Sequence, residues 1–116
     1  MTKVNNLNLV NLKEIKEIQT GLSTEQVAII QQILKQNQHV ETAILYGSRA
    51  KGNYKNGSDI DLTLLGSQLN VDDLLDLQNK FYDSALPHKV DLSIFNDLDN
   101  PDLIEHICRV GVRIDI

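Results

Sequence analysis

The heptapeptide DIDLTLL, which begins at Asp59, alternates between polar and large apolar side chains. Successive side chains of a β-strand point to opposite faces, so Ile60, Leu62 and Leu64 share one face. Asp59 and Asp61 share the other. The apolar face has to be covered by other elements, whereas the carboxylates need water or a cation. The segment therefore predicts a strand of a sheet that is packed on one face and acidic on the other.

The rest of the chain predicts partners for this strand. Alternation with period two predicts further strands over residues 39–47, 89–95 and 112–116. Apolar residues at helical spacing predict helices over residues 24–36, 71–83 and 101–110. Leu12, Ile15 and Ile18 recur at the same spacing and predict a short helix before Gly21. The order of elements predicts an α/β (α+β) fold in which helices pack on a small mixed β-sheet.

Length and composition predict a single cytoplasmic domain. The chain has 116 residues, of which 41% are hydrophobic, enough to build one core. The single cysteine, Cys108, excludes an internal disulfide and a cysteine-based zinc site. The apolar runs are far shorter than the roughly 20 residues that span a bilayer, and the start of the chain has no signal-peptide core. No contact with a membrane is predicted.

The charge of the chain argues against direct binding of nucleic acid. The formal net charge is -5 and the sequence pI is about 5.0, whereas nucleic-acid binders carry a basic stripe. Aromatic residues make up only 4% of the chain, which leaves few surfaces for stacking bases. Any nucleotide chemistry should therefore concern a small, mobile nucleotide.

The two aspartates of the DIDLTLL strand predict a metal site. Carboxylates on one side of a strand repel each other, and each raises the proton affinity of the other. A divalent cation removes the conflict. Ligands that are all oxygen favour a hard ion such as Mg²⁺, which binds one or two carboxylates together with substrate phosphates.

The segment ahead of this strand predicts a phosphate site. Gly47 and Ser48 directly follow the first predicted strand, and a helix that began there would direct free N–H groups at an anion. Arg49 and Lys51 add positive charge. The segment is not a Walker A loop, because Asn53 stands where that motif has its lysine. Phosphate-binding amides and metal-binding carboxylates together indicate phosphoryl or nucleotidyl transfer.

The spacing of these residues resembles a known signature. Gly47 and Ser48, ten further residues, then Asp59 and Asp61 are similar to the GS…DxD pattern of the DNA polymerase β-type nucleotidyltransferases. The chain is most similar to the minimal nucleotidyltransferases, which are encoded beside a HEPN-domain partner. The similarity covers residues 21–116, including YGSRAKGNY, NGSDIDL and HKVDLSIF, and leaves residues 1–20 as an N-terminal extension.

The resemblance implies specific site residues and a partner. Asp91 in KVDLS matches the third metal-binding carboxylate of the family. Asp59, Asp61 and Asp91 would then hold two Mg²⁺ ions and catalyse the reaction, and Gly47, Ser48 and Arg49 would bind ATP. The family further implies transfer of AMP to a tyrosine of a HEPN-domain toxin, which silences the toxin. A homo- or hetero-oligomer is compatible with such a function.

Two alternatives remain open at the level of sequence. A noncatalytic antitoxin would silence its toxin by binding alone, with a vestigial nucleotide site. A transferase that acts on a small molecule such as an aminoglycoside would use the same metal site but normally needs more acceptor-binding surface. No role in the site is predicted for His39, His88 or His106.

Overall fold

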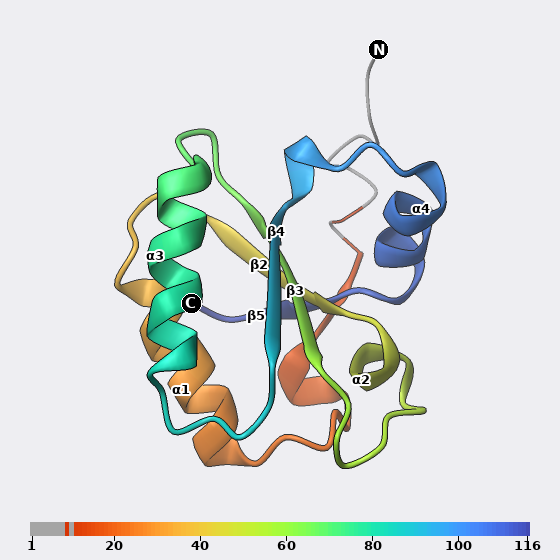
Figure 1. Cartoon of the computed structure of the whole chain (residues 1–116). Coiled ribbons are helices and arrows are strands. Elements are labelled where there is room, and N and C mark those ends of the chain that lie inside the picture. The colour runs from red at the N-terminus through yellow and green to blue at the C-terminus, as the bar shows by residue number, and fades with distance from the viewer. Residues whose placement is uncertain (1–8, 10) are drawn as a thin grey trace.

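The computed structural model describes residue 9 and residues 11–116. In chain order the elements are β1 (Lys13–Glu14), the 3₁₀ turn η2 (Ile15–Glu17), α1 (Thr24–Lys35), β2 (Thr42–Tyr46), α2 (Ser48–Lys51), β3 (Ile60–Leu65), α3 (Val71–Tyr82), β4 (Val90–Ile94), the 3₁₀ turn η3 (Phe95–Asp97), α4 (Pro101–Val110) and β5 (Val112–Ile114). The predicted fold, with helices packed on a small mixed sheet, is confirmed (Figure 1).

The sheet has five strands in the order β1-β5-β2-β3-β4. β2 is antiparallel to β3 and to β5, whereas β3 is parallel to β4 and β1 is parallel to β5. Tyr46 on β2 lies opposite Asp61 on β3, and Asp61 lies beside Asp91 on β4. Residues in register on neighbouring strands point to the same face, so these three side chains form a row.

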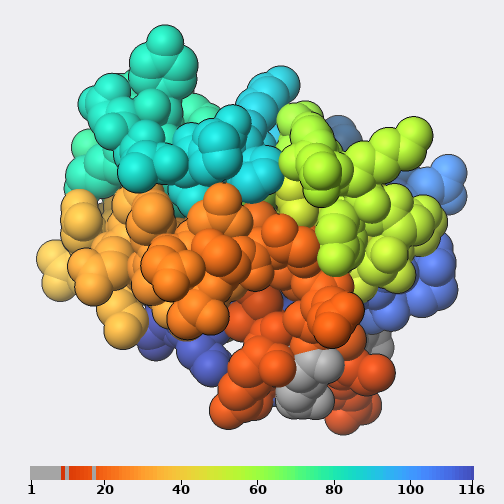
Figure 2. All heavy atoms as spheres, turned by 90° about the horizontal axis from the view of Figure 1, so that it is seen from below, coloured from red at the N-terminus to blue at the C-terminus, as the bar shows by residue number. Residues whose placement is uncertain are grey.

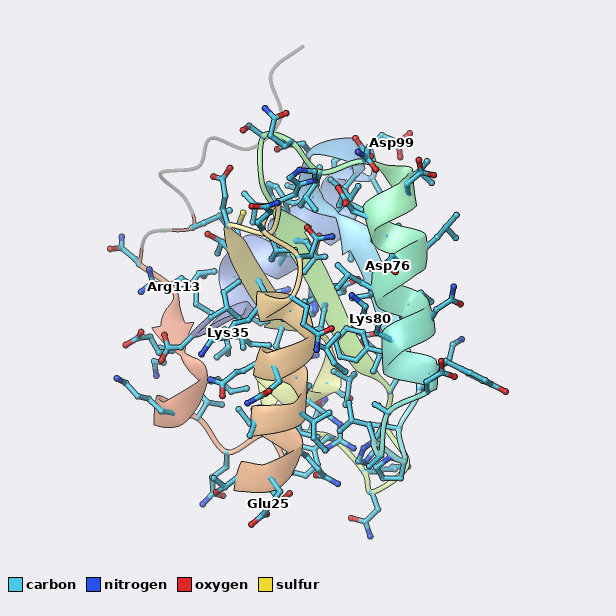
Figure 3. The ribbon with its side chains drawn as sticks, turned by 90° about the vertical axis from the view of Figure 1, so that its left-hand side faces the viewer. Glu25, Lys35, Asp76, Lys80, Asp99 and Arg113 are labelled. Atoms are coloured by element: carbon cyan, nitrogen blue, oxygen red, sulfur yellow. The ribbon has the colours of Figure 1, made fainter. Side chains whose placement is uncertain are left out.

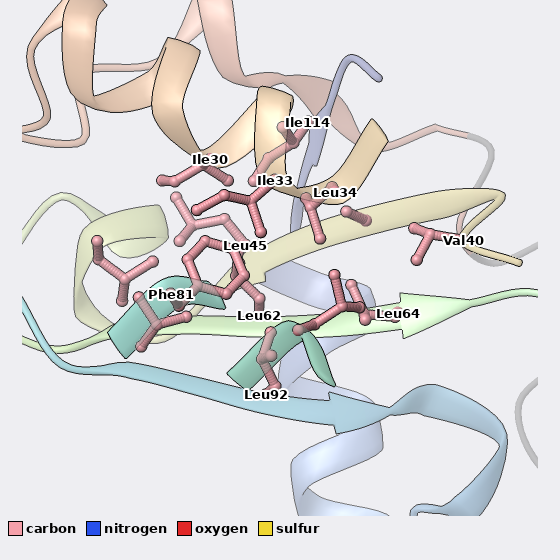
Figure 4. Close-up of a cluster of buried hydrophobic side chains, with 14 of the residues drawn as sticks. Ile30, Ile33, Leu34, Val40, Leu45, Leu62, Leu64, Phe81, Leu92 and Ile114 are labelled. Atoms are coloured by element: carbon pink, nitrogen blue, oxygen red, sulfur yellow. The ribbon is translucent and has the colours of Figure 1, made fainter. Parts of the chain in front are cut away.

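One face of the sheet packs against α1 and α3 and forms the larger core (Figures 1 and 4). Ile30 and Leu34 of α1 face Leu62 and Leu64 of β3 in Figure 4, and all four are completely buried. Phe81 of α3 packs into the same cluster. The alternating leucines of β3 thus go into the core, as their spacing predicts.

The other face of the sheet is only partly covered. Ile104 and Ile107 of α4 pack there with Ile44, Leu65 and Phe95. Leu65 ends β3 and Phe95 follows β4, so this second cluster lies toward the ends of the two strands. The beginnings of β3 and β4, where the aspartates lie, stay outside it. One half of this face is therefore core and the other half is available for chemistry.

The sequence signals for helix ends are found in the structure. Ser23 and Gln26 have the spacing of a capping box, and the capping box is present at the start of α1. Figure 3 shows Glu25 in the first turn of α1 and Lys35 in its last turn, where each charge complements the helix dipole. Asn100 caps α4. None of the helices in residues 9 and 11–116 is long and apolar enough to cross a membrane.

The predicted short helix around Leu12, Ile15 and Ile18 is wrong. The chain there forms the two-residue strand β1, which pairs with β5, and then a single 3₁₀ turn. Leu12 is buried in the cluster under α4, whereas Ile15 is buried in the larger core. Residues of one amphipathic helix would share a face, so pairing with the free edge of β5 has overridden the local spacing. Whether residues 1–20 are a separate extension stays a prediction.

Candidate active site

The turn after β2 brings the backbone against a carboxylate. Gly47 has φ of 76°, in the region that favours glycine, and precedes the single-turn helix α2. A Cβ atom at Gly47 would fall on Oδ2 of Asp61. Only a residue without a side chain can therefore form this turn while Asp61 keeps its position. The strand end that the sequence analysis assigned to phosphate lies directly next to the predicted metal ligand.

Asp61 and Asp91 lie side by side on the half of the sheet face that the second cluster leaves open. We call these two residues the acidic row. They are register partners on parallel strands, and neighbouring strands are roughly 4.8 Å apart. Both point away from the core, since the residues that flank them on each strand are buried. Asp61 and Asp91 therefore share one face of the sheet, as two ligands of one metal site would. Asp59 lies one residue before the start of β3.

The electrostatics of the pair favour a cation. Burial raises the pKa of Asp61 above its usual value, and the carboxylates of Asp91 and Asp59 raise it further, while His106 and Lys89 lower it. Asp61 thus lies within short range of two other carboxylates. A positive ion between them would remove the repulsion and allow full ionisation.

The donor set fits Mg²⁺ held jointly by protein and substrate. Among residues 9 and 11–116, no group of three or more His, Cys, Asp and Glu side chains is placed to hold a metal by itself. The register, however, provides a pair of carboxylates, and Mg²⁺ is usually bound by one or two carboxylates together with phosphate oxygens and water. The absence of histidine and cysteine from the pair is typical of a site for a hard ion.

Two residues of the site, Tyr46 and His106, were not predicted. Nε2 of His106 accepts a hydrogen bond from the Gly47 N–H at 3.2 Å. The imidazole of His106 stands edge-on to the ring of Tyr46, with centroids 6.1 Å apart. Burial raises the pKa of Tyr46, as do Asp61 and Asp91, while a hydrogen bond with Ser93 lowers it. His106 thus fixes the Gly47 turn next to the acidic row, and Tyr46 packs against His106.

The sequence did contain a signal for His106. Along α4, the buried side chains include Ile104 and Ile107, and His106 falls on the same side of the helix as Leu103 and Ile107. A histidine on the apolar side of an amphipathic helix faces the sheet. Its partner Gly47 is 59 residues away in the sequence, and no local pattern indicates that contact.

Arg49, predicted to bind phosphate, is buried beneath the turn. Its guanidinium donates hydrogen bonds to the carbonyl oxygens of Thr20, Asn56 and Ser58, at 2.9 to 3.3 Å. The side chain is only 1% exposed and its guanidinium carbon lies 5.4 Å from the ring centroid of Tyr54. Its donors are directed at the backbone of the loop before β3. In this structure Arg49 is a clamp for that loop.

Two exposed lysines lie near residues of the site. Lys89 is exposed and close enough to lower the pKa of Asp61. Lys51 is exposed on α2 and lowers the pKa of His106, after burial and Arg109. Flexible exposed lysines at the rim of a site can approach a polyphosphate without losing an existing partner.

Comparison with known proteins agrees with this geometry. Residues 28–115 match the family model described as polymerase beta, nucleotidyltransferase. The chain belongs to this nucleotidyltransferase family. The match includes the Gly47 turn and all three aspartates, so each lies within the family domain. The roles assigned to them individually stay predictions.

Relatives within the family include toxin–antitoxin proteins. The chain is 38% identical, over 76 residues, to the "Probable protein adenylyltransferase MntA" of Haemophilus influenzae. The match covers 64% of this chain and 66% of the relative. The chain thus spans slightly less than two thirds of the length of this relative. A crystal structure of a toxin–antitoxin with AMP-PNP matches with a TM-score of 0.64 and 25% identity, over 77% of this chain and 72% of the other. A solved structure from Shewanella oneidensis, described as a tri-AMPylated HEPN toxin in complex with MNT antitoxin, also matches, with a TM-score of 0.58 and 22% identity. The match covers 77% of this chain and 68% of the other, and it shows that the two chains share a fold.

Proposed function

We propose that this nucleotidyltransferase family member transfers AMP from ATP to a tyrosine hydroxyl of a HEPN-domain toxin, and that it acts as the antitoxin. The observation that carries the proposal is the pairing of Asp61 with Asp91 directly beside the Gly47 turn. The Haemophilus influenzae relative, named as a protein adenylyltransferase, supports the reaction. The solved toxin–antitoxin with AMP-PNP supports ATP as the donor.

In this proposal Asp59, Asp61 and Asp91 hold two Mg²⁺ ions. When bound, the metal supplies positive charge to the triphosphate and lowers the pKa of the acceptor hydroxyl. Asp61, which both other carboxylates approach, would contribute to both ions. The backbone at Gly47 and Ser48 would bind the β and γ phosphates, with Lys51 and Lys89 balancing their charge.

The reaction is an in-line displacement at the α-phosphorus. The acceptor hydroxyl gives its proton to solvent water, its oxygen forms a bond to the α-phosphorus, and the bond between the α-phosphorus and the oxygen that bridges to the β-phosphorus breaks. Pyrophosphate leaves on the side of the Gly47 turn. The N–H groups of the turn offset the negative charge that develops there, and His106 fixes the turn through the Gly47 N–H.

Labelled ATP tests the reaction directly. The chain and a HEPN-domain toxin, the proposed acceptor, are incubated with Mg²⁺ and ATP labelled at the α or the γ phosphate. We expect label on the HEPN protein from the α position only. Label from the γ position would indicate a kinase, and no label at all would remove the proposed reaction.

A substitution in the acidic row separates catalysis from silencing by binding. We expect Asp61→Asn to lower transfer by on the order of a thousandfold, because the electrostatic contribution of a bound ion is several kcal/mol. Asp99→Asn, a change of the same kind at an exposed site ahead of α4, should keep full activity. If Asp61→Asn still silences the toxin in cells, the protein acts by binding alone.

We also infer the setting of the reaction. Residues 21–116 would form the catalytic unit, which is consistent with the family match over residues 28–115. A cytoplasmic location would supply ATP and keep Cys108 reduced. The acceptor would come from the HEPN protein in a hetero-oligomer, and no nucleic acid or membrane would be needed.

A further inference from the structure

The outer side of α3 carries an unusual set of exposed side chains. Val71, Leu75 and Tyr82 are 64%, 58% and 89% exposed, and in the described part of the chain no other large hydrophobic residue is as open to solvent. Leu75 is four residues after Val71, and Tyr82 is seven after Leu75, so the three lie along one side of the helix. Eleven residues of helix span roughly 16 Å. We call these three residues the α3 stripe.

A cavity begins where the α3 stripe ends. It has a volume of about 600 Å³ and lies between the end of α3 and the start of β4. Tyr82 belongs to both the stripe and the cavity wall, and the cavity extends along β4 as far as Asp91. The stripe, the cavity and the acidic row are therefore continuous. Figure 2 shows this end of the molecule, where the segment leading into β4 (cyan) lies next to the loop that leads into β3 (yellow-green).

The cavity wall fits an aromatic ring that carries a polar group. Phe81, Leu86 and Pro87 provide apolar surface. Nδ1 of His88 is buried and has no hydrogen-bond partner among the described residues, so it can bond an incoming polar atom. The volume lies within the roughly 300–1,000 Å³ of typical ligand pockets.

The direction of the reaction decides between the two aromatic groups that a transferase of this kind would bind, the nucleobase and the acceptor ring. The Gly47 turn, Asp61, Asp91 and the cavity follow one another across β2, β3 and β4. The entering and leaving oxygens lie on opposite sides of the phosphorus. With pyrophosphate at the Gly47 turn, the acceptor has to arrive from the β4 side, where the cavity lies.

We propose that the α3 stripe and the cavity beside Asp91 form the docking surface for the acceptor protein. The cavity receives the ring of the tyrosine to be modified, with its hydroxyl toward Asp91, and the stripe binds an apolar patch of the same protein. A small acceptor would fill the cavity alone and would leave the stripe exposed. This inference rests on the proposed function, because it assigns the acceptor of the same site.

Truncation of the docking surface tests the inference. Leu75→Ala and Tyr82→Ala remove exposed side chains that do not belong to the acidic row. Gln32→Ala, on the exposed side of α1, is the matched control. The probes are the HEPN-domain toxin of the proposed function as acceptor and Mg²⁺–ATP as donor. We expect each α3 variant to raise the KM for the acceptor by about tenfold and to leave the KM for ATP within about twofold. Gln32→Ala should change neither.

The outcomes distinguish this inference from the proposed function. If the α3 variants modify the acceptor with wild-type KM, or if they raise only the KM for ATP, the docking surface lies elsewhere. If the wild-type chain transfers no label, the proposed reaction fails. Calorimetry without ATP then tests docking alone. If Tyr82→Ala binds the HEPN protein more weakly than the wild type does, and Gln32→Ala binds it as the wild type does, the docking surface is supported. If Tyr82→Ala and the wild type bind the HEPN protein equally well, the docking surface is overturned.

Discussion

At the scale of single residues, Gly47 is the most constrained position of the site. Its positive φ and its contact with Asp61 make two separate demands on the residue. Gly52 meets only the first demand, a positive φ, which is 89°. No atom of the described residues beyond its chain neighbours lies within 4 Å of the place where a Cβ of residue 52 would be. The two glycines flank α2 and are a matched pair for experiment.

We expect Gly47→Ala to abolish activity and Gly52→Ala to preserve it. Both variants introduce backbone strain of roughly 1–2 kcal/mol, because alanine disfavours a positive φ. Only the methyl group at position 47 would also displace Asp61 from its place beside Asp91. Transfer rates and urea unfolding of both variants provide the measurement. Equal activity of the two variants would mean that the close approach to Asp61 has no function.

At the same scale, the residues that the sequence left unassigned follow one physical rule. The strand phase of β3 is local, and it correctly placed Ile60, Leu62 and Leu64 in the core and Asp61 on the opposite face. The contacts of Arg49 with Thr20 and of His106 with Gly47 join residues 29 and 59 positions apart. Such contacts depend on how elements pack, which no short pattern encodes. Arg49, to which the resemblance assigns ATP binding, donates its hydrogen bonds to backbone carbonyls in this structure, and its binding of ATP stays a prediction.

At the scale of elements, Arg49 connects α2 to the loop before β3. We expect Arg49→Met to lower the free energy of unfolding by about 2–4 kcal/mol, because it removes a buried side chain that bonds three backbone carbonyls and leaves the buried carbonyl of Thr20 without its donor. Lys51→Met, on the same helix but exposed, should change stability by less than about 0.5 kcal/mol. Urea unfolding measures both. If Arg49 were instead a phosphate ligand, its variant would keep its stability and lose only ATP affinity.

A second link between elements joins the start of α3 to the loop before β2. Asp73 accepts hydrogen bonds from Nδ2 of Asn37 at 3.0 Å and from the Asn70 N–H at 3.1 Å, and it pairs with Nδ1 of His39 at 2.8 Å. The hydrogen bonds from Asn37 and His39 hold the pKa of Asp73 below its usual value of 3.8. The depressed pKa means that Asp73 stabilises the fold at pH values above the value in the unfolded chain.

We therefore expect the contribution of Asp73 to the free energy of unfolding to be complete at neutral pH. It should disappear as the pH falls below the usual pKa of 3.8 and then through the lower pKa that Asp73 has in the folded protein. Asp73→Ala should have a lower urea midpoint than the wild type at pH 7, and the difference should shrink on acidification. Asp72→Ala, which changes the neighbouring exposed carboxylate, is the control. A difference independent of pH would show that the lost contacts do not depend on the charge of Asp73.

At the scale of the whole molecule, the described N-terminal residues belong to the same packed structure as the rest. Ile15 is 6% exposed in the larger core, and β1 extends the sheet beside β5. We expect Ile15→Ala to lower the stability of the entire chain by about 2–4 kcal/mol in one cooperative transition. Lys16→Ala, at an exposed neighbour, should have almost no effect. An unchanged main transition for Ile15→Ala would mean that this segment unfolds separately.

The sequence predicted the architecture at this scale because each main element has a local signal. The capping box at Ser23, the alternation in DIDLTLL and the Asn100–Pro101 start of α4 are signals of this kind. The pairing of β1 with β5 could not be predicted, since two residues are too few to show a period. The pocket at the end of α3 also depends on packing, because its wall combines a helix end, a loop and a strand.

The position of β4 at the margin of the sheet has a consequence for solubility. Among the residues that the structure describes, β4 has a neighbouring strand on one side only, so its outer backbone groups are a template on which a strand of another molecule can add. The side chain of Gln78 covers one of them, the carbonyl of Val90, at 2.8 Å. Asp91 places a negative charge in the same stretch. We therefore expect the carboxylate of Asp91 to oppose the addition of a strand from another molecule, and an apolar residue in its place to make the chain more prone to associate with itself.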